Sequence, residues 1–240
     1  MQRHSFLTFI FLFCLIFIVV DSTDAITVDE IYRNFKATYE RTENFSADFE
    51  QTTHYQNQRS IAKGKLIFGK PNFLRQEYFD NTNPEELSQL IILDGKTSWS
   101  YTPWLNQVTK TESKGKELLP GIGKSLEDLP KNYNMDIVED EIANPKGIYR
   151  VKLSPKQITP KSTRQEPRTP IEQSAPLPEI IEMWIQSKDW VPVQFSYKNQ
   201  ANDMLIITAL KNVKLNQKLD ESTFKFTVPK NAEVINISPQ

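Results

Sequence analysis

The fold is decided by the stretch Leu90-Ile-Ile-Leu-Asp-Gly-Lys-Thr-Ser-Trp-Ser-Tyr-Thr-Pro103. Its apolar run ends at Asp94-Gly95, a pair suited to the positive backbone angles of a tight hairpin turn. After the turn, Trp99 and Tyr101 alternate with serine and threonine, which is the period of a half-buried strand. The stretch therefore predicts a hairpin whose second strand has an aromatic face and a hydroxyl face.

Similar alternation recurs on both sides of this hairpin. It is clearest over residues 45–53, 61–68 and 73–78, and turn residues separate these segments at 54–59 and 69–72. Further strands are expected at residues 135–138, 148–153, 180–186, 191–198, 204–215 and 232–237. About ten or eleven strands at this spacing indicate a mainly antiparallel sheet that curls round a cavity or closes into a barrel.

Two segments predict helices. Thr27-Val-Asp-Glu30 is a capping box, and it opens a helix with an apolar stripe made of Val28, Ile31, Tyr32, Phe35 and Tyr39. From Ser113 to Pro130, leucine and isoleucine recur at helical spacing, but proline and glycine interrupt them, so two short helices are expected. This broken apolar segment is either a lid over a cavity or a helix that plugs one end of the barrel.

The amino terminus has the pattern of an export signal. A short region with Arg3 precedes an apolar run over residues 6–20, and Thr23 and Ala25 are small enough for a signal-peptidase site. We expect residues 1–25 to be a signal peptide and residues 26–240 to form a single domain. An uncleaved membrane anchor is the alternative. Cys14 lies inside the apolar run without small residues before it, so it does not match a lipidation site.

The mature chain has few groups suited to catalysis or metal binding. Cys14 and His4 would leave with the signal, and His54 would be the one remaining histidine. We therefore expect no disulfide, no metal site, no cofactor and no enzymatic activity. The formal charge moves from −1 to zero on cleavage, which gives no general attraction to nucleic acid. A hydrolase built on His54 is the catalytic alternative.

Residues 156–178 are rich in proline, threonine and charge. Such a segment buries little apolar surface, so an exposed insertion is expected. The spacing of Pro167 and Pro170 also suits a peptide-binding partner, which is the second interpretation.

Four motifs in order resemble the LolA family of periplasmic lipoprotein carriers. They are Phe45-x-Ala-x-Phe49-x-Gln51, Gly64-x-Leu66 followed by Lys70-Pro71-Asn72, Asp94-Gly95-Lys96-Thr97-x-Trp99-x-Tyr101-x-Pro103, and Asp220-x-x-x-Phe224-x-Phe226-x-x-Pro229. Each motif is short, but their order and spacing make the set specific from about residue 27 to residue 237. The resemblance implies an α+β fold, an incomplete antiparallel β-barrel with an N-terminal helix and short helices forming a lid.

The resemblance also implies a function. Carriers of this family are chaperones that take lipoproteins from an inner-membrane ABC transporter and deliver them to an outer-membrane receptor. This chain would then be a monomer in the periplasm that buries lipoprotein acyl chains, each methylene of which costs about 0.8 kcal/mol in water. A sensor of envelope stress or another lipid-binding regulatory protein on the same fold is the alternative. A lipid-anchored receptor is a third possibility, but it would need an N-terminal lipid-bearing cysteine.

The resemblance assigns candidate ligand-binding residues. Lys70 stands where the family usually has an arginine that holds the lid shut, and lysine keeps the charge without the planar fork of donors. Leu74 stands near the apolar mouth of the cavity. The expected cavity wall consists of Phe45, Phe49, Leu66, Phe68, Ile91, Leu93, Trp99 and Tyr101. For each of these, packing in an ordinary core is the alternative.

Overall fold

A computed structural model describes residues 26–112, 126–156, 179–199 and 203–237. The predicted signal peptide, most of the predicted lid and almost all of the proline-rich segment therefore lie outside the described residues.

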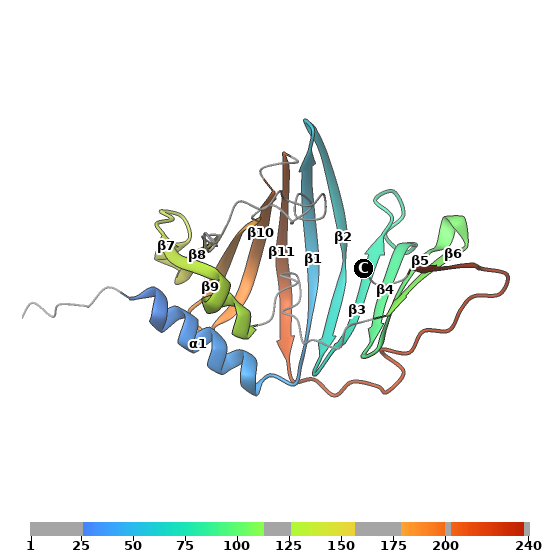
Figure 1. Ribbon diagram of the computed structural model, residues 1–240, viewed down its shortest axis with the longest axis horizontal. Helices are drawn as coiled ribbons and strands as arrows, with labels where there is room; N and C mark the ends of the chain where they lie inside the picture. Colours follow the sequence, from blue (N-terminus) through green and yellow to red (C-terminus); the bar gives the residue numbers. More distant parts are fainter. Residues whose placement is uncertain (1–25, 113–125, 157–178, 200–202, 238–240) are drawn as a thin grey trace, which may run out of the picture.

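The described residues form one large sheet (Figure 1). Its strands are β1 (Asn44–Tyr55), β2 (Gln58–Gly69), β3 (Phe73–Phe79), β4 (Leu87–Asp94), β5 (Thr97–Thr102), β6 (Gln107–Glu112), β7 (Tyr133–Val138), β8 (Ile148–Pro155), β9 (Glu179–Gln186), β10 (Val191–Asn199), β11 (Met204–Leu215) and β12 (Glu233–Ile237). Their order across the sheet is β12-β6-β5-β4-β3-β2-β1-β11-β10-β9-β8-β7, so the sheet is open rather than closed. Neighbouring strands are antiparallel, except that β12 runs parallel to β6.

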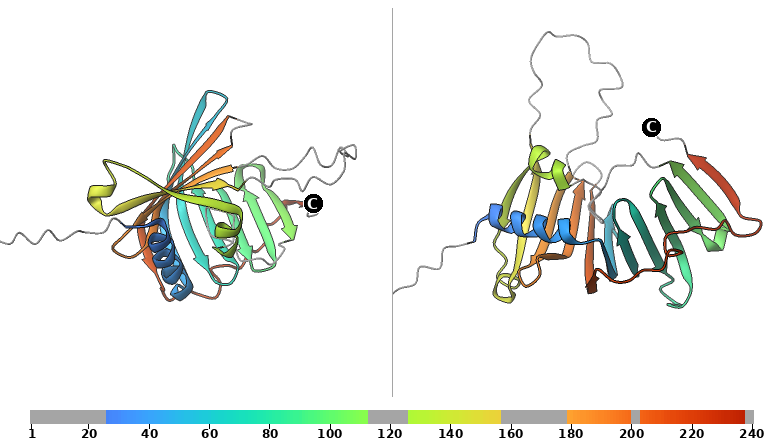
Figure 2. Two further views of the ribbon diagram at one scale, coloured as in Figure 1. Left: turned by 60° about the vertical axis from the view of Figure 1, so that its left-hand side comes forward. Right: turned by 90° about the horizontal axis from the view of Figure 1, so that it is seen from below.

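Helix α1 (Val28–Arg41) lies against the half of the sheet that ends in β7 (Figure 2). Thr27 caps it, because its hydroxyl accepts a hydrogen bond from the backbone N–H of Glu30 at 3.2 Å. Ile31 and Phe35 on its apolar stripe are buried. The predicted helix, its cap and its buried stripe are confirmed, and the fold is the predicted incomplete barrel with helices.

The core under α1 also receives two short helices. These are the 3₁₀ helix η2 (Leu126–Asp128) and α2 (Leu129–Asn132), and Leu126 and Leu129 join the core. The other members of the core are Ile31, Phe35, Tyr133, Val151, Leu153, Ile181, Met183 and Ile185. Full burial of a side chain of this kind stabilises the fold by about 1.5–3 kcal/mol. Two further 3₁₀ helices, η1 (Pro103–Leu105) and η3 (Asn144–Lys146), form connections.

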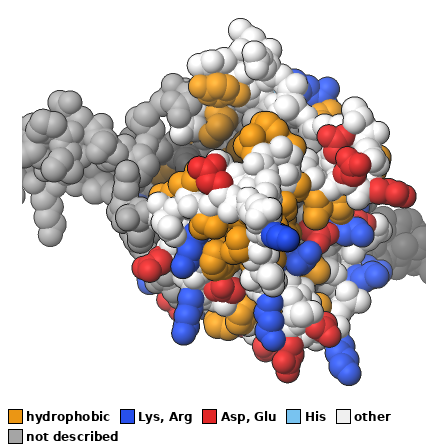
Figure 3. Space-filling view, turned by 90° about the vertical axis from the view of Figure 1, so that its right-hand side faces the viewer, with side chains coloured by type: hydrophobic (Ala, Val, Ile, Leu, Met, Phe, Trp, Pro, Cys, Tyr) orange, Lys and Arg blue, Asp and Glu red, His pale blue; other side chains and the backbone are white. Residues whose placement is uncertain are grey.

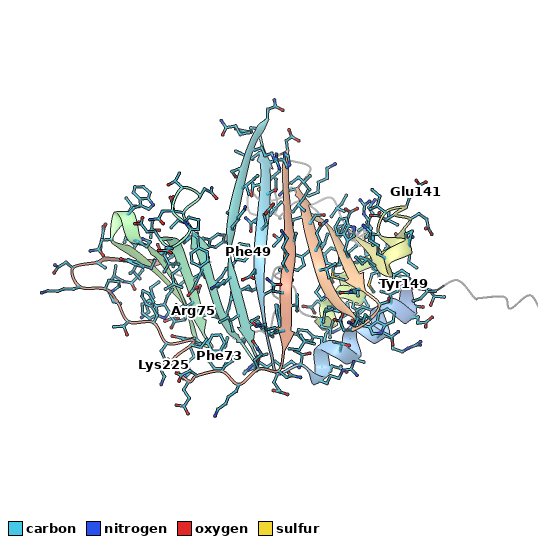
Figure 4. All side chains as sticks on the ribbon, turned by 180° about the vertical axis from the view of Figure 1, so that it is seen from behind. Phe49, Phe73, Arg75, Glu141, Tyr149 and Lys225 are labelled. Atoms are coloured by element: carbon cyan, nitrogen blue, oxygen red, sulfur yellow. The ribbon has the colours of Figure 1, made fainter. Side chains whose placement is uncertain are left out.

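The register divides the sheet into two faces. Phe45 pairs with Phe68, and the Phe68 ring stacks on Tyr39 of α1, so these residues define the α1 face. The other side is the opposite face. Residues 216–232 between β11 and β12 cross the opposite face, where Phe224 packs on Phe73 with ring centroids 5.3 Å apart. Figure 4 shows Phe73 and Arg75 beside this C-terminal segment, which also carries Lys225.

Hydrophobic side chains gather between charged ones on the side of the molecule that carries β6 and β12 (Figure 3). Trp104 in η1 is 78% exposed, and Leu105 beside it is 49% exposed. The other large exposed apolar residues here are Val228, Val234, Ile235 and Ile237. This side therefore presents apolar surface at the edge of the sheet.

Candidate functional site

The α1 face of β1–β6 carries no charged residue. Residues that pair across these strands share a face, and the pairing places every aspartate, glutamate, lysine and arginine of β1–β6 on the opposite face. They are Asp48, Glu50, Arg59, Lys63, Lys65, Arg75, Glu77, Asp94, Lys110 and Glu112. A buried unpaired charge is costly, so a face without charges is suited to apolar contents.

Six of the eight predicted wall residues lie together on this α1 face, and Leu74, predicted near the mouth of the cavity, lies there with them. Phe45 and Phe68 pack with ring centroids 5.7 Å apart, and Phe49 meets Tyr78 edge to face at 5.1 Å. The register continues the apolar floor outward across β2, β3 and β4 through Leu66, Leu74, Ile91 and Leu93. The sheet thus brings together side chains from four consecutive strands, β1–β4.

Among the pockets on the α1 face, two lie beside the core and share a lining residue. The first lies under the C-terminal half of α1, has a volume of about 530 Å³ including its mouth, and is lined by Phe35, Thr38, Tyr39, Thr42, Phe45, Trp190, Val191, Pro192, Phe195, Leu210, Val213 and Leu215. The second, of about 600 Å³, is lined by Phe49, Gln51, Leu66, Leu74, Gln76, Tyr78, Phe195, Tyr197, Ile206 and Thr208. Phe195 lines both, so the pockets adjoin.

Trp99 and Tyr101 do not lie on this wall. Leu93 pairs with Ser98 and Ile91 pairs with Ser100, so β5 presents its hydroxyls to the α1 face. The aromatic rings point to the opposite face, where Phe226 lies 5.4 Å from Trp99 and 6.3 Å from Tyr101. The expectation that these two residues share a wall with Phe45 and Phe68 is wrong. Adjacent residues of a strand face opposite sides, so the serines of β5 lie on the α1 face and the two aromatic residues do not.

The turn before Trp99 is held by Asp94. Gly95 has φ +90°, as predicted for this hairpin. The Asp94 carboxylate accepts hydrogen bonds from the indole N–H of Trp99 at 2.9 Å and from the backbone N–H of Thr97 at 2.8 Å. Burial acts to raise the pKa of Asp94, but these hydrogen bonds and that from Lys96 outweigh it, and the pKa is lowered. The predicted hairpin is confirmed, and its aspartate stabilises the turn.

Lys70 joins the sheet to the end of α1. Its Nζ donates to the backbone carbonyl oxygens of Tyr39 and Glu40, both at 2.8 Å, and lies 4.9 Å from the Tyr39 ring centroid. A cation at these carbonyls stabilises the negative end of the helix dipole. Lys70 therefore fastens α1 over the first pocket. The predicted role of Lys70 in holding the lid shut stays a prediction, because residues 113–125 lie outside the described residues.

Sequence reasoning missed several lining residues. Tyr39 and Phe195 contribute large aromatic surfaces to the first pocket, and Gln76 contributes an amide to the second. Tyr39 belongs to the predicted helix stripe, which could have indicated its direction. Phe195 lies in an alternating segment, but alternation alone does not reveal which strands stand side by side.

The polar side chains that β1–β6 place on the α1 face are neutral. Gln76 donates from Nε2 to the Tyr78 hydroxyl at 2.8 Å. Burial raises the pKa of Tyr78 above its usual value, although this hydrogen bond acts the other way, so the phenol is uncharged at neutral pH. Within the described ranges, no group of three histidine, cysteine, aspartate or glutamate side chains could hold a metal ion. The same part of the chain has no helix with the length and hydrophobicity needed to cross a bilayer.

Comparison with known sequences identifies the family. Residues 40–163 match the family model for the outer membrane lipoprotein carrier protein LolA. The chain belongs to the LolA family. An outer-membrane lipoprotein carrier protein of Pasteurella multocida is 27% identical over 191 residues, 79% of this chain and 78% of that protein. The carrier of Glaesserella parasuis is 43% identical over 67 residues, 27% of this chain and 30% of that protein.

Other similar proteins are less informative about function. An uncharacterized protein of Methanocaldococcus jannaschii is 24% identical over 217 residues, which are 89% of this chain but only 55% of that protein. An uncharacterized conserved protein of Thermus thermophilus has a similar structure, with TM-score 0.49, 13% identity, and coverage of 87% of this chain and 98% of that one. A LolA superfamily protein of Nitrosomonas europaea has a TM-score of 0.40 and 11% identity. The match covers 84% of this chain and 99% of that one.

Proposed function

We propose that this protein is a periplasmic carrier that buries the acyl chains of lipoproteins against the α1 face and moves them from the inner to the outer membrane. The observation that carries the proposal is the absence of charged residues from the α1 face of β1–β6, next to two pockets. Membership of the LolA family, whose model is described as an outer membrane lipoprotein carrier protein, supports it.

The energetics of acyl transfer fit this site. An acyl chain gains about 0.8 kcal/mol for each methylene removed from water, so an apolar floor provides the binding energy. Release requires that contacts between residues of the protein replace the contacts with the acyl chain. The first pocket lies between the sheet and α1, and Lys70 fastens that helix through two hydrogen bonds. A small displacement of α1 would therefore change the space available to an acyl chain.

The remaining parts of the proposal follow from this role. The carrier would be a monomer without catalytic activity, and it would exchange cargo with an inner-membrane ABC transporter and an outer-membrane receptor. The exposed Trp104 and Leu105, together with the apolar residues on β12, offer surface for such contacts. Burial and release of an acyl chain need no chemical step.

Binding of a fluorescent acyl probe to the purified mature protein tests the proposal. Leu74→Glu places a charge on the α1 face and should weaken binding at least about tenfold, because the charge loses its solvation when the acyl chain enters. Thr52→Glu is the matched control: it adds the same charge to the opposite face, between Ile61 and Ile207, and should leave binding unchanged.

Two results would contradict the proposal. In one, native mass spectrometry of the protein purified from the periplasm of the cells that make it shows no bound lipid, and the purified protein does not bind the fluorescent acyl probe. The other is normal sorting of lipoproteins in cells depleted of the protein.

A further inference from the structure

The second pocket is half apolar and half polar. Phe49, Leu66, Leu74, Phe195 and Ile206 provide its apolar lining. The remaining lining side chains are the amides of Gln51 and Gln76 and the hydroxyls of Tyr78, Tyr197 and Thr208. A site that held acyl chains alone would have no use for five polar side chains. Polar groups in a largely apolar pocket fix the orientation of a ligand and its specificity.

These polar groups come from both sides of the central strand β1. Gln51 pairs with Thr208 on β11, whose other neighbour is Phe195 on β10. On the other side, Gln76 on β3 pairs with Leu66 and donates a hydrogen bond to Tyr78. Since the Tyr78 oxygen accepts this bond, its own O–H can donate toward the pocket. Apart from Tyr197, the pocket therefore offers amide N–H and hydroxyl donors from three strands, β1, β3 and β11.

The donors are all neutral. None of the ten lining residues is charged, and each lysine and arginine of β1–β3, β10 and β11 belongs to the opposite face by register. Carbonyl oxygens of esters and amides suit such donors, because a neutral hydrogen bond replaces the one lost to water. A phosphate would enter this pocket without a lysine or arginine from those strands, and a buried charge without a counter-charge is strongly disfavoured.

We propose that this pocket binds the uncharged linkage region of the cargo, the ester or amide carbonyls that join its acyl chains to glycerol or to the polypeptide. The protein then selects neutral acylglycerol groups over anionic phospholipids with the same chains. Such selection would let a carrier take up lipid-modified protein in a membrane composed mainly of phospholipid. This inference rests on the proposed function, because it presupposes that acyl chains occupy the α1 face.

The test compares two ligands that differ only at the head group. Dioleoylglycerol and dioleoylphosphatidic acid are titrated separately against the mature protein loaded with a fluorescent acyl probe, and displacement of the probe is measured. Dioleoylglycerol should bind at least about tenfold more tightly, which corresponds to one uncompensated polar group. Gln51→Lys adds a cation to the pocket and should remove or reverse the preference. Thr52→Lys, the adjacent position on the opposite face, should retain it.

The outcomes separate the two proposals. Equal affinity for both lipids, or equal effects of Gln51→Lys and Thr52→Lys, overturns the linkage pocket and leaves the carrier function intact. If the probe and both lipids fail to bind, the carrier function itself is overturned. If Gln51→Lys does not fold, as judged by circular dichroism, the comparison of the two lipids on the unmodified protein decides the question.

Discussion

The rings of Trp99 and Phe226 lie 5.4 Å apart on the face of the sheet turned away from α1. Phe226 belongs to the segment that crosses this face before β12, and Phe224 in the same segment packs on Phe73. The hairpin motif at residues 94–103 and the C-terminal motif at residues 220–229 therefore pack against each other. Aromatic pairs of this kind contribute about 0.5–1.5 kcal/mol beyond the area that they bury. The aromatic face of the hairpin holds the C-terminal segment in place.

Replacement of Trp99 by alanine should lower the free energy of unfolding by about 2 kcal/mol, since a half-buried indole and its hydrogen bond to Asp94 are lost. Affinity for acyl chains should stay unchanged, because the side chain is outside both pockets. Urea denaturation and titration with an acyl probe measure the two effects. Trp104→Ala, which removes an indole that is 78% exposed, should change stability by no more than about 0.5 kcal/mol. A loss of lipid binding in Trp99→Ala would contradict this assignment.

Lys70→Met should loosen the C-terminal end of α1. The two carbonyl oxygens of Tyr39 and Glu40 lose their shared donor, and the unfolding free energy should fall by about 1 kcal/mol. Hydrogen exchange in α1 should accelerate. Lys70→Arg should retain most of the effect, since it keeps a cation at the helix end. Lys63→Met is the control, because the Lys63 side chain is 64% exposed and forms a surface ion pair with Glu50. Equal exchange rates in Lys70→Met and Lys63→Met would refute the role given to Lys70.

Gly64→Ala should destabilise the fold and disturb the second pocket. A Cβ at this position would lie 2.6 Å from the Phe49 ring and would clash with the backbone carbonyl oxygen of Glu77 on β3. The cost should be about 3 kcal/mol, because backbone cannot move aside as a flexible side chain can. Displacement of Phe49 should also weaken binding of an acyl probe. Ala62→Gly, on the same face of β2, should cost no more than about 1 kcal/mol and leave binding intact. A stable Gly64→Ala protein would show that β3 can shift.

Local patterns in the sequence predict the elements and much of the apolar floor. The helix cap at Thr27 and the turn at Asp94-Gly95 each depend on a few neighbouring residues, and both are present as expected. The wall formed by Phe45, Phe49 and Leu66 could also be identified, because alternation places residues two apart on one face.

The side of the sheet to which the hairpin aromatics point could not be predicted in the same way. Residues 90–93 are apolar at both odd and even positions, so both faces of the first strand are apolar. The pattern therefore does not reveal which face is turned toward α1. That choice depends on register with β3 and on Phe226, which is 127 positions beyond Trp99 in the sequence. The parallel pairing of β12 with β6 is another contact between distant segments that no local pattern encodes.

Acid should weaken the hairpin through Asp94. Its pKa is lowered in the folded protein, so the ionised carboxylate contributes stability above the ordinary aspartate pKa of about 3.9, and that contribution is lost as the pH falls through the folded pKa. Asp94→Asn removes the titration. The stability difference between the native protein and this variant should therefore be greatest near neutral pH and should shrink below about pH 4.

Urea midpoints measured from neutral pH to about pH 2.5 follow this difference. Trp99→Phe keeps the ring but removes the indole donor to the Asp94 carboxylate, so it should reduce the part of the acid sensitivity that Asp94 causes. Trp104→Phe makes the same change at an exposed position and should leave the pH profile as it is in the native protein. If Asp94→Asn and the native protein lose stability in parallel as the pH falls, other carboxylates account for the acid sensitivity and Asp94 holds the turn without a pH-dependent contribution.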